Sequence, residues 1–537
     1  MAITHQPSFR GIRAIPRESQ QAAAGSRWIV PIFFVVVALP AEFALKIFDA
    51  TLSPARLFAL FVILPAFAKL LSDRTVRLMA FDYVLFCYLL WLWLAILVNH
   101  PLGKGIYLGG SLTAEALGAY AIARAYVRTY EDFARAVGVY FTTILVVAVF
   151  AIVESFARLA IIHEIAFRLI GEEVPLWITS NYDAMYDRLG LFRPFSTFDH
   201  CILYGTFCAG ATALIYFLSR DQARKWLRLS AVVVAVFFSL SSGPYMGCLM
   251  ALGLCLWEKV TRPIPNRVLL TIGGLLAVLL VIMIGSNRGL IEILIASTLD
   301  PKSGYYRLFI WEYGSAAVAQ NPLFGISLDK WTRAHFMSTS IDNFWLVMAM
   351  LGGLPAIGAL LLFVLSILLR VNRRSTLPEL RWRASARLGW TFTVLILCVE
   401  GLTVHYWGQL YAYFFFMIGL GAWMADTQRG FAAAAEPRQH IRQEPSGWVG
   451  RRVSPASRPL PSAMQTAKTH CIGTGCTAAL QRYRARPIGL SSGKLRRTLL
   501  PRRSMVTPPT RLVPLLRLTL NTGLFHVKQL RVPMAMH

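Results

Sequence analysis

Long apolar runs alternate with short polar connections over the first 425 residues of the chain. Most of these runs are long enough to cross a bilayer core of about 30 Å as a helix. Inside hydrocarbon, backbone polar groups must be satisfied within the segment, which favours helices. The pattern therefore predicts an all-α polytopic membrane protein with about 12 transmembrane helices. The expected spans are 28–48, 54–71, 79–98, 106–125, 136–156, 198–218, 227–241, 244–258, 267–285, 343–369, 388–404 and 407–425.

Basic residues cluster in alternate connections between these spans. Examples are Arg74 and Arg77, Arg124 and Arg128, Arg220 and Arg224, Arg262 and Arg267, and Arg370 and Arg373. The positive-inside rule places these connections and both termini in the cytoplasm. The two long loops, 157–197 and 286–342, then face outward as periplasmic loops. The short spans 227–241 and 244–258 form either two thin crossings or a re-entrant pair.

This topology divides the chain into a cytoplasmic N-terminal segment, 1–27, a membrane domain, 28–425, and a tail, 426–537. From Thr427 onward the tail holds 19 of the 54 Lys and Arg residues but only two of the 27 acidic residues. It shows no sustained hydrophobic period, so we expect a disordered cytoplasmic tail. Such a tail either contacts anionic membrane lipids or is a dispensable extension.

Composition agrees with this class: 56% of the residues are hydrophobic and 15% are charged, with a mean hydropathy of +0.53. The net charge of +27 would by itself suggest a nucleic-acid partner. Much of that charge lies in the tail, however, and no recognition module accompanies it, so we expect no binding of nucleic acid.

The most informative polar stretch runs from Gly285 to Gly353, between two apolar spans. It carries Arg288, Arg307 and His335, and it ends in Asp342-Asn343 before a Gly-Gly turn. A charged and aromatic-rich loop on the outer side of a membrane is a suitable place for an anionic substrate.

Five sequence pieces occur in a recognisable order. They are Arg193 with Phe195-Ser196-Thr197-Phe198, the turn Ser239-Leu240-Ser241-Ser242-Gly243, Arg307 with Trp311, Asn321-Pro322-Leu323-Phe324-Gly325, and Asp342-Asn343. In order and spacing they resemble the O-antigen ligase and polymerase family of bacterial envelope enzymes, over residues from about 30 to 425. Within that family the chain is most similar to the exopolysaccharide-polymerase branch.

The resemblance implies a metal-independent membrane glycosyltransferase of the bacterial inner membrane that needs no cofactor. Its donor would be a glycan on undecaprenyl diphosphate, and its action would join repeat units into surface polysaccharide. A flippase and a chain-length regulator are the partner proteins that such a polymerase implies. The ligase branch has a His where this chain has Asp342, which favours polymerase over ligase.

Arginine is the expected ligand of the departing diphosphate, because a guanidinium group binds phosphate oxygens through two parallel hydrogen bonds. Arg193 and Arg307 are the leading candidates, and Arg288 is a further one. The alternative for each is an arginine that reaches the headgroup layer or pairs with a loop carboxylate.

An acceptor hydroxyl needs a base, and Asp342 and His335 are the two candidates. Asp342 has a competing structural role, since Asp is a preferred N-cap and a span begins beside it. We expect further substrate contacts from His200, Asn343, Trp311 and Glu42. Glu42 falls inside the first expected span, where it either lines the donor cavity or forms a buried pair with an arginine.

The sequence leaves open a non-catalytic scaffold of an envelope assembly complex, and two further functions as well. One is an O-antigen ligase that transfers the lipid-linked glycan to lipid A core or to another acceptor. The other is a polytopic transporter of envelope precursors, although such transporters tend to show internal repeats that we do not find here.

Overall fold

The computed structural model describes residues 28–47, 50–73, 78–175, 187–264, 266–285, 301–338, 340–373 and 381–426. By internal contacts the chain divides into two units, Met1–Arg442 and Gln443–His537, and all described residues belong to the first. The predicted N-terminal segment 1–27, Arg288 and the tail from residue 427 lie outside the described residues.

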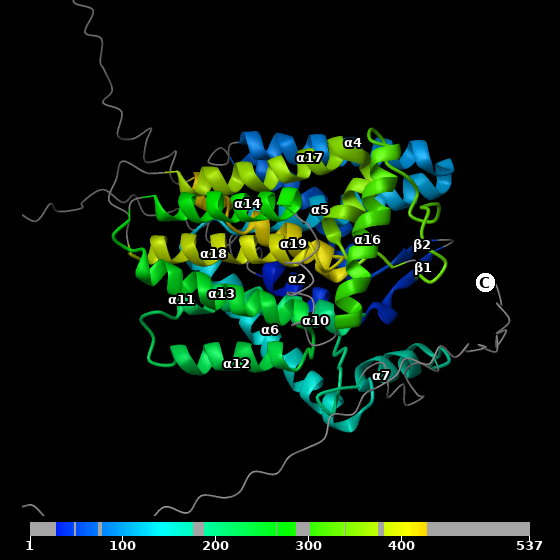
Figure 1. Ribbon diagram of the computed structural model, residues 1–537. Helices are drawn as coiled ribbons and strands as arrows, with labels where there is room; N and C mark the ends of the chain where they lie inside the picture. The colour runs from blue at the N-terminus through cyan, green and yellow to red at the C-terminus, as the bar shows by residue number, and fades with distance from the viewer. Residues whose placement is uncertain are drawn as a thin grey trace, which may run out of the picture. The chain divides into compact units, whose positions relative to one another are not determined.

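The described part of the chain is a bundle of helices with two small hairpins (Figure 1). Its longer helices are α3 (Pro54–Ser72), α4 (Ala80–Asn99), α5 (Leu102–Tyr126), α6 (Tyr130–Ala157), α13 (Ser242–Val260), α14 (Arg267–Gly285), α16 (Pro301–Gln320), α17 (Phe344–Asn372) and α18 (Arg381–Glu400). Its shorter helices are α2 (Ile29–Val37), η2 (Ala41–Phe43), α7 (Ile161–Ile170), α10 (Cys201–Ala209), α11 (Ala211–Leu218), α12 (Lys225–Phe237) and α19 (Gln409–Gly419). The hairpins are β1 (Leu45–Ile47) with β2 (Ala50–Leu52), and β3 (Asp187–Arg188) with β4 (Leu191–Phe192), both antiparallel.

Each of the expected spans contains a helix, which confirms the all-α class. Five segments are long and apolar enough to cross a membrane: Pro54–Ser72, Ala80–Asn99, Tyr130–Ala157, Cys201–Leu218 and Phe344–Asn372. The protein is thus a multi-pass helical membrane protein, and the count of about 12 crossings stays a prediction.

The first expected span, 28–48, is wrong in its form. Its helix, α2, ends at Val37, and the chain then passes through Pro40 into a short 3₁₀ turn and the β1–β2 hairpin. Proline favours such a break because it has no N–H to donate to a continuing helix. Glu42 therefore lies beyond the end of α2 and not inside a span.

The Asn321–Gly325 piece packs against the Gly-Gly turn that follows Asp342-Asn343. Gly353 has φ +69° inside α17, where the helix kinks, and Gly325 has φ +64°. The Ile326 N–H donates to the Met350 carbonyl at 2.6 Å, and the Leu354 N–H donates to the Pro322 carbonyl at 2.7 Å. A side-chain carbon at Gly353 would lie 2.2 Å from the Leu323 carbonyl oxygen, so this close approach requires glycine.

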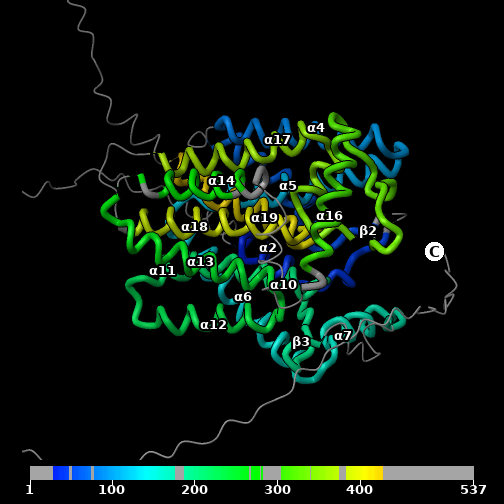
Figure 2. Tube along the Cα trace, in the orientation of Figure 1, coloured from blue at the N-terminus to red at the C-terminus, as the bar shows by residue number. Residues whose placement is uncertain are grey.

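The two predicted outward loops both contribute to one end of the bundle. Helix α7 from loop 157–197 and α16 from loop 286–342 lie at the end that also carries β1 and β2 (Figures 1 and 2). An ion pair between Lys104 and Asp329, 2.7 Å long, joins the start of α5 to the chain that follows α16. We call this the loop end of the bundle.

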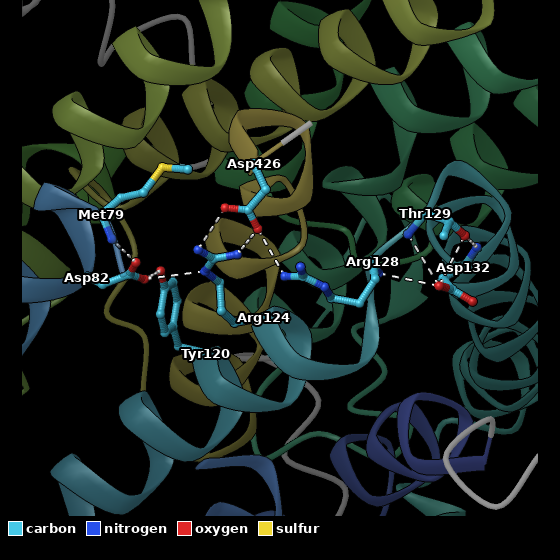
Figure 3. A network of polar contacts seen from close by, with 8 residues as sticks. All are labelled: Met79, Asp82, Tyr120, Arg124, Arg128, Thr129, Asp132 and Asp426. Atoms are coloured by element: carbon cyan, nitrogen blue, oxygen red, sulfur yellow. Dashed lines mark hydrogen bonds and ion pairs between the residues drawn. The ribbon is translucent and has the colours of Figure 1, made fainter. Parts of the chain in front are cut away.

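A buried charge cluster marks the far end of α5 (Figure 3). Arg124, whose side chain is 1% exposed, pairs with Asp82 and with Asp426, and Arg128 pairs with Asp426 at 2.9 Å. Twenty residues of helix separate Lys104 from Arg124, which corresponds to about 30 Å along α5. The connection that carries Arg124 and Arg128 therefore lies at the end of α5 opposite to the loop end. The sides of the membrane on which the two ends lie stay a prediction.

Close helix contacts in the bundle use small residues. Gly118 of α5 lies against Ala59 of α3, and Gly419 of α19 lies against the Tyr120 backbone of α5. Small residues let helix backbones approach closely, which is the usual basis of packing between membrane helices. This packing holds the segments that carry the candidate site.

Candidate functional site

A buried arginine lies on the segment that joins β4 to α10, residues 193–200, which we call the Arg193 segment. A tight turn at Leu189 and Gly190, with φ +56° and +75°, closes the β3–β4 hairpin that precedes it. Arg193 is 7% exposed, and its Nε has no hydrogen-bond partner among the described residues. A buried cation is costly unless it is paired or hydrogen-bonded, so this group is available for an anion.

Helix α6 holds the backbone of the Arg193 segment through hydrogen bonds. The Ser196 N–H donates to Glu154 Oε2 at 2.7 Å, and the Ser196 hydroxyl donates to the Val147 carbonyl at 2.8 Å. The side-chain amide of Gln409 also donates to the Thr197 carbonyl at 3.2 Å. These bonds fix the path of the chain directly after Phe195.

His200 ends this segment as the N-cap of α10. Its Nδ1 accepts a hydrogen bond from the Ile202 N–H at 3.1 Å, so that nitrogen carries no proton in this arrangement. The charges of Arg193 and Asp342 both act on this ring. The structure therefore brings Asp342 into the region of Arg193 and His200, which share one segment, although Asp342 comes from a distant part of the sequence.

Asp342 lies half-buried just before α17 and accepts a hydrogen bond from the Ser340 hydroxyl at 3.0 Å. The N-cap of α17 is the neighbouring Asn343, whose Oδ1 accepts from the Leu346 N–H at 2.9 Å. Asn343 also donates to the Leu402 carbonyl and is 1% exposed. The capping role thus belongs to Asn343, and the Asp342 carboxylate is not used as the cap.

A cavity of about 280 Å³ lies beside Asp342. It is lined by Leu328, Ser340, Ile341, Val347, His405 and Trp407. Burial lowers the pKa of His405 to about 4, against the opposing charge of Asp342, so its imidazole is neutral at pH 7. The Trp407 indole donates to Asp199 Oδ2 at 3.2 Å, which links this wall to the Arg193 segment.

His405, Trp407 and Asp199 were not among the sequence-predicted site residues. The run His405-Tyr406-Trp407 at the end of an apolar span is equally typical of an interfacial aromatic belt. The glycine at position 408 was a further sequence signal of a special backbone position, and the structure gives it a φ of +51°.

Arg307 and Trp311 are half-buried on α16. The preceding residue, Tyr306, donates from its hydroxyl to Ser338 Oγ at 3.1 Å and accepts from the Ser338 N–H. This ties the Arg307 turn of α16 to the chain that leads into Asp342. The substrate roles of Arg307 and Trp311 stay predictions.

His335 is exposed, and its ring lies against Phe336 with centroids 5.8 Å apart. A solvent-exposed histidine lacks the buried surroundings that adjust the pKa of a general base, so the geometry favours Asp342 over His335. Arg288 lies outside the described residues, and its predicted role cannot be placed.

Glu42 pairs with a histidine in the described part of the chain, and not with an arginine. Its Oε1 lies 2.6 Å from Nδ1 of His163 on α7, and the side chains of the two residues are 10% and 1% exposed. His163 Nε2 in turn lies 3.0 Å from the Phe198 carbonyl of the Arg193 segment. Glu42 thus contacts His163, which in turn contacts the Arg193 segment, so Glu42 lies among the residues that support the site.

The fold and this site define a multi-pass helical membrane protein with a buried arginine, a carboxylate and a neutral imidazole at the loop end of its bundle. Residues 227–357 match the family model described as O-antigen ligase, which confirms the resemblance to the O-antigen ligase and polymerase family. The matched stretch runs from α12 into α17 and includes Arg307, His335 and Asp342, but not Arg193. No curated protein and no solved structure matches the chain.

The family consists of membrane enzymes of the glycosyltransferase type that act in surface polysaccharide assembly. The match does not distinguish the exopolysaccharide branch, nor polymerase from ligase. Among the described residues, no three His, Cys, Asp or Glu side chains gather closely enough to hold a metal ion.

Proposed function

We propose that this protein polymerises undecaprenyl-diphosphate-linked oligosaccharide repeat units into surface polysaccharide at the periplasmic face of the bacterial inner membrane, with both termini in the cytoplasm. The observation that carries the proposal is Arg193, a buried guanidinium at the loop end of the bundle whose Nε has no partner in the described part of the chain. The family match and the neighbouring Asp342 support it.

In this proposal Arg193 binds the diphosphate of the donor. As the bond between the sugar C1 and the diphosphate oxygen breaks, the electron pair leaves with the diphosphate and increases its negative charge. A donor aimed at charge that develops in the transition state contributes a large part of catalysis. Arg307 would bind a second phosphate oxygen from α16.

Asp342 is the proposed base. Its carboxylate accepts the proton of the acceptor hydroxyl while that oxygen forms the new bond to the sugar C1. Ser340, which donates to Asp342, orients the carboxylate. Neutral His405 and Trp407 line the adjoining cavity, where an acceptor sugar can stack on the indole ring.

A strain that lacks the chromosomal copy and carries Arg193→Gln tests this function. We expect surface glycan to collapse from long chains to single repeats, with normal amounts of protein in the membrane. Arg168→Gln is the matched control, because Arg168 is 70% exposed on α7 and loses the same charge at the same end. Long chains in the Arg193→Gln strain would disprove the role of Arg193.

The same experiment separates polymerase from ligase, the function that the description of the matched family names. Loss of a ligase leaves long polymer that is not attached to its acceptor. Loss of a polymerase leaves single repeats on the lipid carrier.

A further inference from the structure

His163 is a buried histidine whose two ring nitrogens both face acceptor atoms. Nδ1 lies 2.6 Å from the Glu42 carboxylate, and Nε2 lies 3.0 Å from the Phe198 carbonyl. A carbonyl oxygen can only accept, so Nε2 must carry a proton. The contact with Glu42 needs a second proton between Nδ1 and Oε1, on whichever of the two atoms it resides.

The pair therefore holds one proton more than a neutral imidazole beside a carboxylate. Burial of the ring opposes protonation of His163, but the hydrogen bond and the charge of Glu42 outweigh burial and raise its pKa. Glu154 of α6 and Asp199 of the Arg193 segment also act on the ring through their charges, and both favour the added proton. The charges of three carboxylates thus favour protonation of this imidazole.

The position of the pair gives the proton a consequence for the site. His163 lies on α7 and Glu42 on η2, and their link to the site is the Phe198 carbonyl, two residues before His200. Without the second proton, either Nε2 opposes a carbonyl oxygen with a lone pair or Nδ1 opposes a carboxylate. Because the charge-assisted bond to the Glu42 carboxylate is the stronger of the two, the single remaining proton stays on Nδ1, and the Phe198 carbonyl loses its donor.

We propose that the His163–Glu42 pair is a positioning device, which holds the Arg193 segment in its active arrangement only while the pair keeps its second proton. This inference rests on the proposed function for its consequence, since it assumes that Arg193 binds the donor. It makes the activity sensitive to periplasmic pH, with loss on the alkaline side.

Glu42→Gln is the decisive variant. The side-chain amide that this substitution introduces can donate to Nδ1 of a neutral His163, which leaves the proton on Nε2 for the Phe198 carbonyl. The network is then satisfied without the extra proton. Glu172→Gln is the matched control, because Glu172 is 47% exposed and pairs with Lys46 at the same end of the bundle.

The first measurement is polymer formation by the full-length protein in proteoliposomes, with undecaprenyl-diphosphate-linked repeat units as the probe, from about pH 6 to about pH 9. We expect the rate of the wild-type protein and of Glu172→Gln to fall by about tenfold per pH unit above the titration of the pair. Glu42→Gln keeps its rate across this range. His163→Phe, which removes both donors, is slow at every pH.

The second measurement is thermal unfolding over the same pH range, which needs no activity. Because the folded-state pKa of His163 is raised, its stabilisation is present below the unfolded pKa of about 6.5 and is lost as pH rises through the folded value. We expect this loss in the wild-type protein and not in Glu42→Gln.

Superimposable unfolding profiles for the wild-type protein and Glu42→Gln would show that the His163–Glu42 pair does not hold an extra proton. Different unfolding profiles with identical rate profiles would overturn its positioning role. If the wild-type protein forms no polymer at any pH, the proposed function fails, while the unfolding comparison still decides whether the pair holds its proton.

Discussion

Asn343 donates from its side-chain amide to the Leu402 carbonyl at 2.7 Å, and this bond ties the start of α17 to the turn after α18. The same side chain caps α17 through the Leu346 N–H, and the Phe344 N–H donates to the Gly401 carbonyl at 2.8 Å. Asp342 precedes this junction directly. The hydrogen bonds of Asn343 therefore fix the position of Asp342, the proposed base.

Replacement of Asn343 by Ala removes the cap and the bond to Leu402. We expect destabilisation by about 2–3 kcal/mol, since each lost bond to a buried group costs about 1 kcal/mol or more. Asn343→Asp retains the capping oxygen but cannot donate to Leu402, so its loss should be intermediate. Thermal unfolding in detergent measures the series, and equal values for the two variants would show that the cap contributes nothing beyond the Leu402 bond.

Gly353→Ala tests the contact between the two glycine turns. The new methyl group would meet the Leu323 carbonyl at a backbone conformation that strains any L side chain. We expect a loss of more than about 2 kcal/mol and a shift of the loop that leads to Asp342. Gly358→Ala on the same helix, where nothing lies within 4 Å, should be neutral or slightly stabilising. The free energy of unfolding of both variants is the quantity to measure, and equal values for the two would contradict a requirement for glycine at position 353.

The helices of the expected spans followed from the apolar pattern because each span must satisfy its own backbone, whereas α7 and α16 lie in stretches that were expected to be loops. The end of α2 at Val37 was missed, since the apolar residues continue beyond Pro40 and length alone suggested a full span. A proline followed by a carboxylate was the available signal. The Gly352-Gly353 turn was recognisable from the sequence, but its contact with Gly325 depends on the tertiary fold.

The site was predictable only in part. Arg193 and Asp342 were identified through their sequence pieces, and in the structure the charges of both act on the His200 ring. The partner of Glu42 was not predictable, because His163 lies 121 residues away and no local pattern links the two. Asp342 and Asn343 are both good N-caps, and only the structure, in which the Leu346 N–H donates to Asn343 Oδ1, shows which one is used.

Arg124→Ala removes the centre of the charge cluster in Figure 3. Asp82 and Asp426 then lose a buried partner, and breaking such a pair costs about 3–5 kcal/mol. Arg135→Ala is the control, because Arg135 is 45% exposed and its pair with Asp132 contributes less than about 1 kcal/mol. Comparable unfolding temperatures for the two variants would contradict the structural role of this cluster.

Asp342→Asn keeps the size of the proposed base and removes its ability to accept a proton. We expect polymer formation to slow by about 10²–10⁴-fold, with binding of the lipid-linked donor unchanged. His335→Gln should retain nearly full activity, because His335 is exposed. Turnover and donor binding, measured separately on purified protein, distinguish the two candidates. A slow His335→Gln beside a fast Asp342→Asn would reverse the assignment.

His405 should give a pH dependence of stability opposite in sign to that of His163. Its folded-state pKa of about 4 lies below the unfolded value of about 6.5, so the unfolded chain binds the proton more readily. The stabilisation from a neutral His405 is complete above about pH 6.5 and is lost as pH falls from about 6.5 to about 4. His405→Gln cannot take up this proton, so its unfolding temperature should fall less than that of the wild-type protein over this acid window. Because carboxylates titrate in both proteins, the difference between the two curves is the quantity to measure, and parallel curves would show that His405 is not held neutral by burial.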